Sequence, residues 1–163
     1  MYKRTRLGFL LGALAAGGAL PADELGINDL PDIKEGLWES STVMAGSMDT
    51  PVHSTMCISN AVFRKLYLDT RKNADNPCKQ THSERHGSVI TQDTECHFSG
   101  KVTHSKSVTT LTGNTAIRLE TRDADNKVES LIEMKWVGAC PAGMKLGDVA
   151  GPDGKVIMNA LTP

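Results

Sequence analysis

SVTTLTGNTAIRLETRDADNKVESLIEMKW, residues 107–136, decides the fold, because short turn signals divide it into three alternating segments. The turn signals are Gly113-Asn114 and Asp125-Asn126. Between them apolar and polar residues alternate with a period of two, which is typical of strands with one buried face. The stretch therefore predicts an antiparallel meander that buries one side of its sheet.

Treating each turn as a two-residue hairpin loop sets the strand register. The first turn places Val108 opposite Leu119, and the second places Leu119 opposite Ile132. The two registers agree, since both put one apolar set on a single face: Val108, Ile117, Leu119, Ile132, Met134 and Trp136. On the other face Arg118 lies opposite Glu133, and we expect an ion pair across the strands.

The chain before this meander predicts further strands and a helix. Leu37–Met44 and Val52–Ile58 have the composition of strands. Ser59 is positioned to cap a short helix with one apolar face, made of Val62, Phe63, Leu66 and Tyr67. His86-Gly87 marks another turn, and residues 156–161 read as an edge strand.

We therefore expect a mainly β domain: an antiparallel meander of about six or seven strands, curved into a half-barrel or sandwich, with one short helix after Cys57. The predicted division has four parts. These are a signal peptide (1–22), a connecting segment (23–33), the β domain (34–141), and a loop or tail with a possible edge strand (142–163).

The N-terminus has the order of a secretory leader. Basic residues at positions 3–6 precede the apolar run Leu7–Leu14, and the apolar stretch ends near Leu20. That length is short of the roughly 20 apolar residues that a membrane-spanning helix needs. We predict cleavage after Ala19 or Ala22, a periplasmic location, and no membrane span after the leader is removed.

Composition argues against a nucleic-acid partner. The 18 basic and 19 acidic residues nearly cancel, so no long-range field attracts nucleic acid. Aromatic residues make up only 4 % of the chain, which leaves few stacking platforms for bases. We expect no nucleic-acid partner.

Four cysteines follow the leader. An even count in an oxidising compartment favours two disulfides over a catalytic thiol, and the wide spacing disfavours zinc. Four cysteines allow three pairings. A three-residue turn around Gly87 places Cys78 opposite Cys96, so we prefer that pair, which leaves Cys57 with Cys140.

Two short motifs bracket the β domain. Gly36-Leu37-Trp38-Glu39 opens it, and Met134-Lys135-Trp136-Val137-Gly138-Ala139-Cys140 closes it, with the cysteine spacing and Ser99-Gly100 between them. In these features the chain resembles a bacterial exported family called domain of unknown function 3617, over roughly 34–141. The resemblance implies a small periplasmic β-rich domain without an established activity, and it transfers no catalytic residues.

Histidine and methionine provide one candidate site. Imidazole and thioether groups suit copper in an oxidising compartment, so His53 with Met44, Met48 and Met56 is an alternative metal site. The predicted register places His82 opposite Gln92, so the strand histidines do not converge. The competing interpretation is that the methionines fill the core and the histidines lie on solvated faces.

Trp38 and Trp136 provide the other candidate site, since each lies in a terminal strand of the domain. They either pack in the core or line a cavity that holds an apolar ligand. Neither G-x-S-x-G nor H-E-x-x-H occurs, so we expect no enzyme and no cofactor. The predicted function is a non-catalytic binding module for an apolar small molecule or an envelope protein, with copper binding as the alternative.

Overall fold

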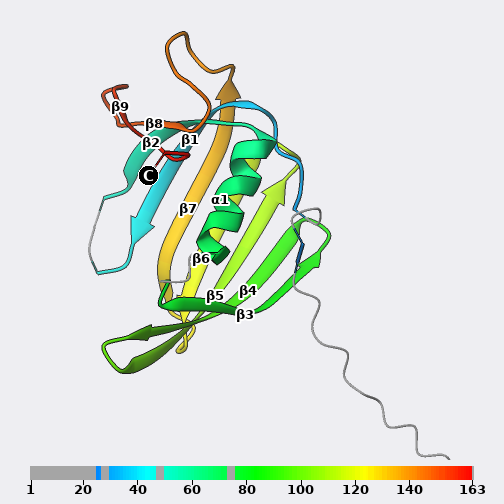
Figure 1. The fold of residues 1–163 in the computed structure, drawn as a ribbon, viewed down its shortest axis with the longest axis vertical. Helices are drawn as coiled ribbons and strands as arrows, with labels where there is room; N and C mark the ends of the chain where they lie inside the picture. Colours follow the sequence, from blue (N-terminus) through cyan, green and yellow to red (C-terminus); the bar gives the residue numbers. More distant parts are fainter. Residues whose placement is uncertain (1–24, 27–29, 47–49, 73–75, 163) are drawn as a thin grey trace, which may run out of the picture.

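The protein folds around one antiparallel sheet of nine strands, in the order β3-β4-β5-β6-β7-β1-β2-β8-β9 (Figure 1). The structure is a computed structural model and describes residues 25–26, 30–46, 50–72 and 76–162. The predicted signal peptide lies outside these residues. Within them the sheet is not closed into a barrel, since β3 and β9 are its two ends. The strands are β1 Gly36–Met44, β2 Val52–Ile58, β3 Cys78–His86, β4 Val89–Phe98, β5 Lys101–Thr112, β6 Ala116–Asp123, β7 Val128–Gly138, β8 Asp148–Ala150 and β9 Val156–Asn159.

The mainly β prediction is confirmed, although the sheet has more strands than expected. The region that opened the sequence analysis forms β5, β6 and β7. Its second register is as predicted, with Leu119 opposite Ile132 and Arg118 opposite Glu133. The predicted ion pair forms, with 2.9 Å between Arg118 Nη1 and Glu133 Oε1.

The register predicted between β5 and β6 is wrong by one residue. Thr112 pairs with Ala116, so the loop holds three residues rather than two. Leu119 therefore lies opposite Thr109, and Val108 moves to the other face. The buried apolar residue of β5 is Leu111, which lies opposite Ile117.

The β3–β4 hairpin has the predicted cysteine pairing, but its turn length and register differ from the prediction. Its turn has two residues, since His86 pairs with Val89, and this places His82 opposite Asp93 rather than Gln92. An irregularity beside Thr81 then adds one residue to β3. The added residue offsets the shorter turn, so Cys78 still lies opposite Cys96.

In the described part of the chain, one helix covers one side of the sheet. This helix, α1 Asn60–Lys72, begins where predicted, and Ser59 Oγ accepts a hydrogen bond from the backbone N of Val62 at 3.3 Å. Capping of this kind satisfies an N–H that has no partner inside the helix. Figure 1 shows α1 lying against the sheet. We call this side the helix face and the opposite side the outer face.

The core lies between α1 and the helix face. Its buried residues come from the helix, from five strands and from the chain before β1: Leu25, Leu30, Ile33, Trp38, Ile58, Val62, Ile90, Leu111 and Ile117. Three of them, Leu25, Leu30 and Ile33, belong to the segment predicted as a connection (23–33). That segment is attached to the helix, because Ile33 N donates to Asn60 Oδ1 at 2.7 Å and Arg64 pairs with Asp32 at 2.9 Å.

The chain after Cys140 also joins the sheet. The predicted edge strand is β9, and β8, which was not predicted, connects it to β2. β8 contacts β2 through only two pairs, Thr55 with Ala150 and Met56 with Val149. In the described part of the chain no helix has the length and apolar character to cross a bilayer.

Candidate functional site

The two tryptophans lie opposite each other on β1 and β7. Each indole N–H donates to the chain just before β1: Trp38 Nε1 to Lys34 O at 2.9 Å, and Trp136 Nε1 to Glu35 O at 3.0 Å. The Lys34 ammonium lies 3.5 Å from the centre of the Trp136 ring, within the range of a cation–π contact. Trp38 is 0 % exposed, so it offers no surface to a ligand. The pair fixes how the chain enters the sheet.

The four cysteines form two disulfides in the pairing that the sequence favoured. Cys57 and Cys140 join the end of β2 to the segment after β7, with 2.03 Å between their sulfur atoms. Cys78 and Cys96 join β3 to β4 at 2.04 Å. All four side chains are bonded, so none is available as a nucleophile.

The residues of the alternative copper site do not come together. His53 is exposed on the outer face of β2, whereas Met56 lies on the helix face of the same strand and packs against the core. Met44 is exposed at the end of β1, and Met48 lies outside the described residues. Across the described ranges, no three His, Cys, Asp or Glu side chains are grouped to hold a metal ion.

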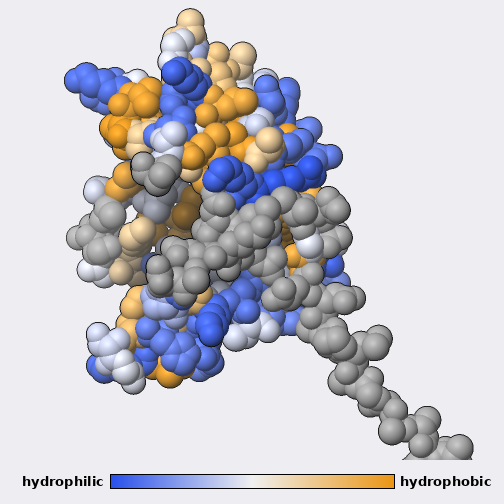
Figure 2. All heavy atoms as spheres, viewed as in Figure 1, coloured by the Kyte–Doolittle hydropathy of each residue, from blue (hydrophilic) through white to orange (hydrophobic). Residues whose placement is uncertain are grey.

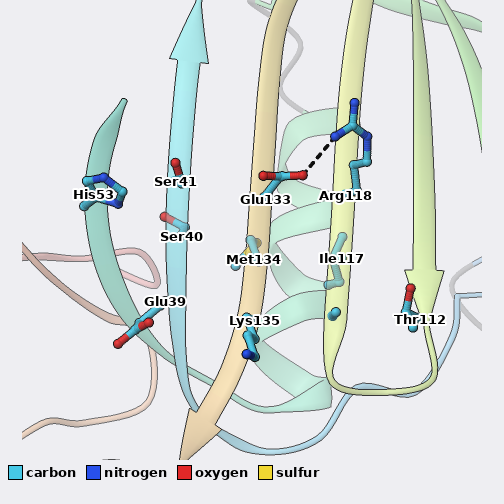
Figure 3. Close-up of a pocket in the computed structure, with 11 residues that line it drawn as sticks. Glu39, Ser40, Ser41, His53, Thr112, Ile117, Arg118, Glu133, Met134 and Lys135 are labelled. Carbon is cyan, nitrogen blue, oxygen red and sulfur yellow. Dashed lines mark hydrogen bonds and ion pairs between the residues drawn. The ribbon is translucent and has the colours of Figure 1, made fainter. Parts of the chain in front are cut away.

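A depression on the outer face is a site that the sequence reasoning missed. It has a volume of about 540 Å³ and crosses five neighbouring strands (Figure 3). Figure 3 shows the strands of the depression in front of α1. The charged lining residues belong to the outer face, whereas Ser40, Ile117 and Met134 alternate with them and belong to the helix face. Its lining consists of Glu39, Ser40, Ser41, His53, Thr112, Ala116, Ile117, Arg118, Glu133, Met134 and Lys135.

The outer-face side chains of the depression form two adjacent rows across the strands. One row is Glu39, Lys135, Ala116 and Thr112, and the other is His53, Ser41, Glu133 and Arg118. Ser41 and Ala116 are small and have charged side chains beside them in the rows, and we call these two positions the low points of the depression. β7 lies between these low points, because Ser41 is on β1 and Ala116 on β6.

The charges of the depression differ in how they are partnered. Arg118 Nη2 donates to Glu120 and Nη1 to Glu133, both at 2.9 Å, and these hydrogen bonds raise the pKa of the Arg118 guanidinium. Hydrogen bonds from Arg118 and Arg122 lower the pKa of Glu120. Glu39, His53 and Lys135 make no ion pair with another described residue. These three groups are available to an incoming ligand.

The rows could not be found from sequence alone because they depend on β1 pairing with β7. Arg118 and Glu133 were predicted, since their strands follow each other in the chain. Glu39 and Lys135 meet only through a long-range pairing that no turn specifies. The available signal was the alternation of charged residues along β7, which indicates a polar outer face.

The two ends of the sheet differ in character. β3 carries Lys79, Glu84, Arg85 and His86, and its pairing with β4 is irregular beside Thr81. β9 instead exposes three successive apolar side chains: Val156 at 48 %, Ile157 at 66 % and Met158 at 55 %. Figure 2 shows hydrophobic residues gathered at the end of the molecule that carries β8 and β9.

β9 is held through an acidic residue on β8. Asp148 is buried and accepts hydrogen bonds from the backbone N of Lys145 and from Asn159 Nδ2, both at 2.7 Å. These bonds lower the pKa of Asp148. Gly147 N also donates to Cys57 O at 2.8 Å, beside the Cys57–Cys140 disulfide. The apolar edge is therefore anchored to the rest of the sheet.

Comparison with known proteins places most of the domain in a sequence family. A family model described as "Protein of unknown function (DUF3617)" matches residues 33–140. The search of curated proteins and the search of solved structures returned no match. β8 and β9 lie beyond the matched residues.

Proposed function

Because the chain belongs to the DUF3617 family, whose function is not assigned, we propose a function from its own geometry. The protein is an exported, non-catalytic binding module, and β9 docks an extended apolar segment of another envelope protein. The segment adds to the sheet as a further strand, by the mode in which backbone hydrogen bonds provide affinity and alternate side chains provide specificity.

The observation that carries the proposal is the contrast between the two sheet edges. Proteins protect exposed edges with charged side chains and bulges, because an open edge pairs with other chains. β3 has both kinds of protection. β9 has no charged side chain within Val156–Asn159, although its pairing with β8 also shifts by one residue beside Ile157. Ile157 is 66 % exposed. An apolar edge that is anchored and carries no charge is suited to pairing with a partner strand.

Export is supported by the leader sequence and by the disulfides. Two disulfides in a domain of this size are typical of an oxidising compartment. N-terminal sequencing of the protein from a periplasmic fraction tests this part. We expect a mature chain that begins at Leu20 or Asp23. A chain that keeps residues 1–22 and remains in the cytoplasm contradicts export.

The absence of catalysis is supported by the arrangement around the one serine–histidine neighbour pair of the depression. Ser41 lies opposite His53 on the outer face. Acyl transfer needs a hydrogen bond from the nucleophile to its base. No such bond joins these two side chains in the described part of the structure, and the cysteines are bonded to one another. This arrangement supports binding over acyl transfer at the depression.

Site-specific photo-crosslinking tests the docking edge. A photoreactive amino acid replaces Ile157 in one variant and Thr81, on β3, in a matched control. We expect light-dependent adducts with an envelope protein from position 157 and none from position 81. In the same assay Met158→Pro lowers the yield, because proline disrupts strand pairing at that position.

Three outcomes contradict the proposal. Equal adducts from both positions indicate non-specific contact. An adduct of the chain with itself indicates a homodimer instead of a partner. No adduct at position 157, with the variant folded and exported, shows that β9 docks nothing in the cell.

A further inference from the structure

The charged depression on the outer face is separate from the β9 edge, since β8 lies between β2, the last strand of the depression, and β9. We propose that it binds a short peptide through both charged ends, the terminal ammonium and the terminal carboxylate. Its volume of about 540 Å³ lies within the range usual for small-molecule sites. The inference does not depend on the docking function proposed for β9.

The carboxylate lies over Ala116. Ala116 has Lys135 opposite it on β7 and Thr112 opposite it on β5. Arg118 is two residues further along β6 on the same face. Lys135 makes no ion pair with another described residue, so its ammonium is available to an anion. Arg118 keeps its carboxylate partners and contributes positive charge close to the ligand carboxylate. The Thr112 hydroxyl donates a hydrogen bond to that carboxylate.

The ammonium lies over Ser41. Ser41 has His53 opposite it on β2 and Glu133 opposite it on β7, and Glu39 is two residues back along β1. Glu39 has no ion-pair partner among the residues that the structure describes. A carboxylate, a hydroxyl and a neutral imidazole each accept hydrogen bonds from an ammonium group.

The spacing of the two low points selects the length of the ligand. β1 and β6 are two strand spacings apart, and Ser41 and Ala116 are offset by one row. Strands lie about 4.8 Å apart and successive rows about 7 Å apart, which puts the low points about 12 Å apart. An extended chain spans about 3.3–3.6 Å per residue, so a peptide of three or four residues reaches between them.

Charge complementarity favours such a zwitterion over an anion alone. The depression pairs an available cation, Lys135, with an available anion, Glu39, on adjacent strands, and these two side chains are not joined to each other. A simple anion is attracted by Lys135 but repelled by Glu39. A peptide with free ends pairs its carboxylate with Lys135 and its ammonium with Glu39. The backbone groups between its ends contact the polar side chains of the depression.

Titration with triglycine, followed by NMR of the full mature chain, tests the site. The matched ligands are N-acetyl-triglycine, which lacks the ammonium, and N-acetyl-triglycine amide, which lacks both charges. We expect triglycine to shift the amide signals of Ser41 and Ala116, and the doubly blocked peptide to shift neither. Glu39→Gln and Lys135→Gln each weaken binding about fivefold, the effect of one exposed ion pair.

The controls are Glu129→Gln and Lys127→Gln, which remove the same charges from exposed positions outside the depression. Both bind triglycine as the unmodified chain does. Equal binding of N-acetyl-triglycine overturns the proposal, since the site is then specific for the carboxylate alone. It is also overturned when no peptide shifts either signal, or when the control substitutions weaken binding as much as Glu39→Gln.

Discussion

Gly36 lies where β1 and β7 approach too closely for any side chain. A Cβ atom added there lies 2.1 Å from Gly138 O and 2.6 Å from Trp136 Nε1. The residue also has φ of +143°, a conformation that residues with a side chain rarely adopt. The glycine that opens the Gly36-Leu37-Trp38-Glu39 motif is therefore required both by packing and by backbone conformation.

Gly36→Ala should lower the free energy of unfolding by about 3 kcal/mol, through overpacking combined with backbone strain. Gly113→Ala is the control, because Gly113 has φ of +58° but nothing within 4 Å of its Cβ position. It should cost about 1 kcal/mol, from strain alone. Urea unfolding followed by tryptophan fluorescence measures both. Similar losses in the two variants contradict the close approach at Gly36.

Single residues also explain which parts of the fold the sequence could predict. Ser59, the apolar face of α1 and the bounds of β2 follow from local signals, and the structure agrees with them. Thr115 and Thr81 each shift a register by one residue without any glycine or proline to mark the change. Such shifts depend on how strands fit their neighbours, and a pattern of alternation does not record that.

At the scale of elements, the β8–β9 hairpin pairs with the rest of the sheet through only two residue pairs, Thr55 with Ala150 and Met56 with Val149. Asp148 holds it, and hydrogen bonds from Lys145 and Asn159 lower the pKa of this carboxyl. A carboxyl with a lower pKa in the folded state stabilises the protein above its unfolded pKa, about 3.9 for aspartate. That stabilisation is lost as the pH falls through the folded value.

Asp148→Asn should therefore flatten the pH dependence of stability below about pH 4. The variant is less stable than the unmodified chain at neutral pH, and the two converge in acid. Thermal unfolding midpoints across a pH series measure this, with Asp125→Asn, in the exposed β6–β7 turn, as the control. Parallel curves for Asp148→Asn and the unmodified chain disprove the role of the carboxylate.

Some residues of the candidate sites are brought together by a single hairpin, and others only by pairing of strands that are far apart in the sequence. The Arg118–Glu133 pair was predictable because one hairpin produces it. The depression was not, since His53, Glu39 and Lys135 come together only when β1 inserts between β2 and β7. Trp38 was ambiguous in sequence, because an aromatic residue in a terminal strand suits a core and a cavity equally. The structure places the Trp38 side chain in the core, where it packs between the sheet and α1.

At the scale of the whole molecule, the two disulfides constrain very different lengths of chain. Cys57 and Cys140 are separated by 83 residues, whereas Cys78 and Cys96 are separated by 18. Loop-closure entropy predicts that the first contributes about 4.5 kcal/mol and the second about 3 kcal/mol. The longer loop also ties the β8–β9 end to the sheet.

Replacing both cysteines of a pair by alanine tests this order. Cys57→Ala with Cys140→Ala should destabilise the domain more than Cys78→Ala with Cys96→Ala, by about 1.5 kcal/mol from the loop lengths. Burial of Cys57 adds to the difference. Equilibrium urea unfolding gives both values. The opposite ranking contradicts a stabilisation governed by the size of the closed loop.

The position of β1 between β2 and β7 also has a consequence for the order in which the protein folds. Trp136 bonds to Glu35, 101 residues earlier in the chain, and β1 has no other neighbour on that side. Local pairs form early in folding, and pairs distant in sequence form late. During synthesis the β1–β2 hairpin therefore keeps the β7-facing edge of β1 unpaired until β7 has been synthesised.

Nascent chains stalled before residue 128 should be digested by protease within β1 and β2, and chains stalled after residue 163 should resist this digestion.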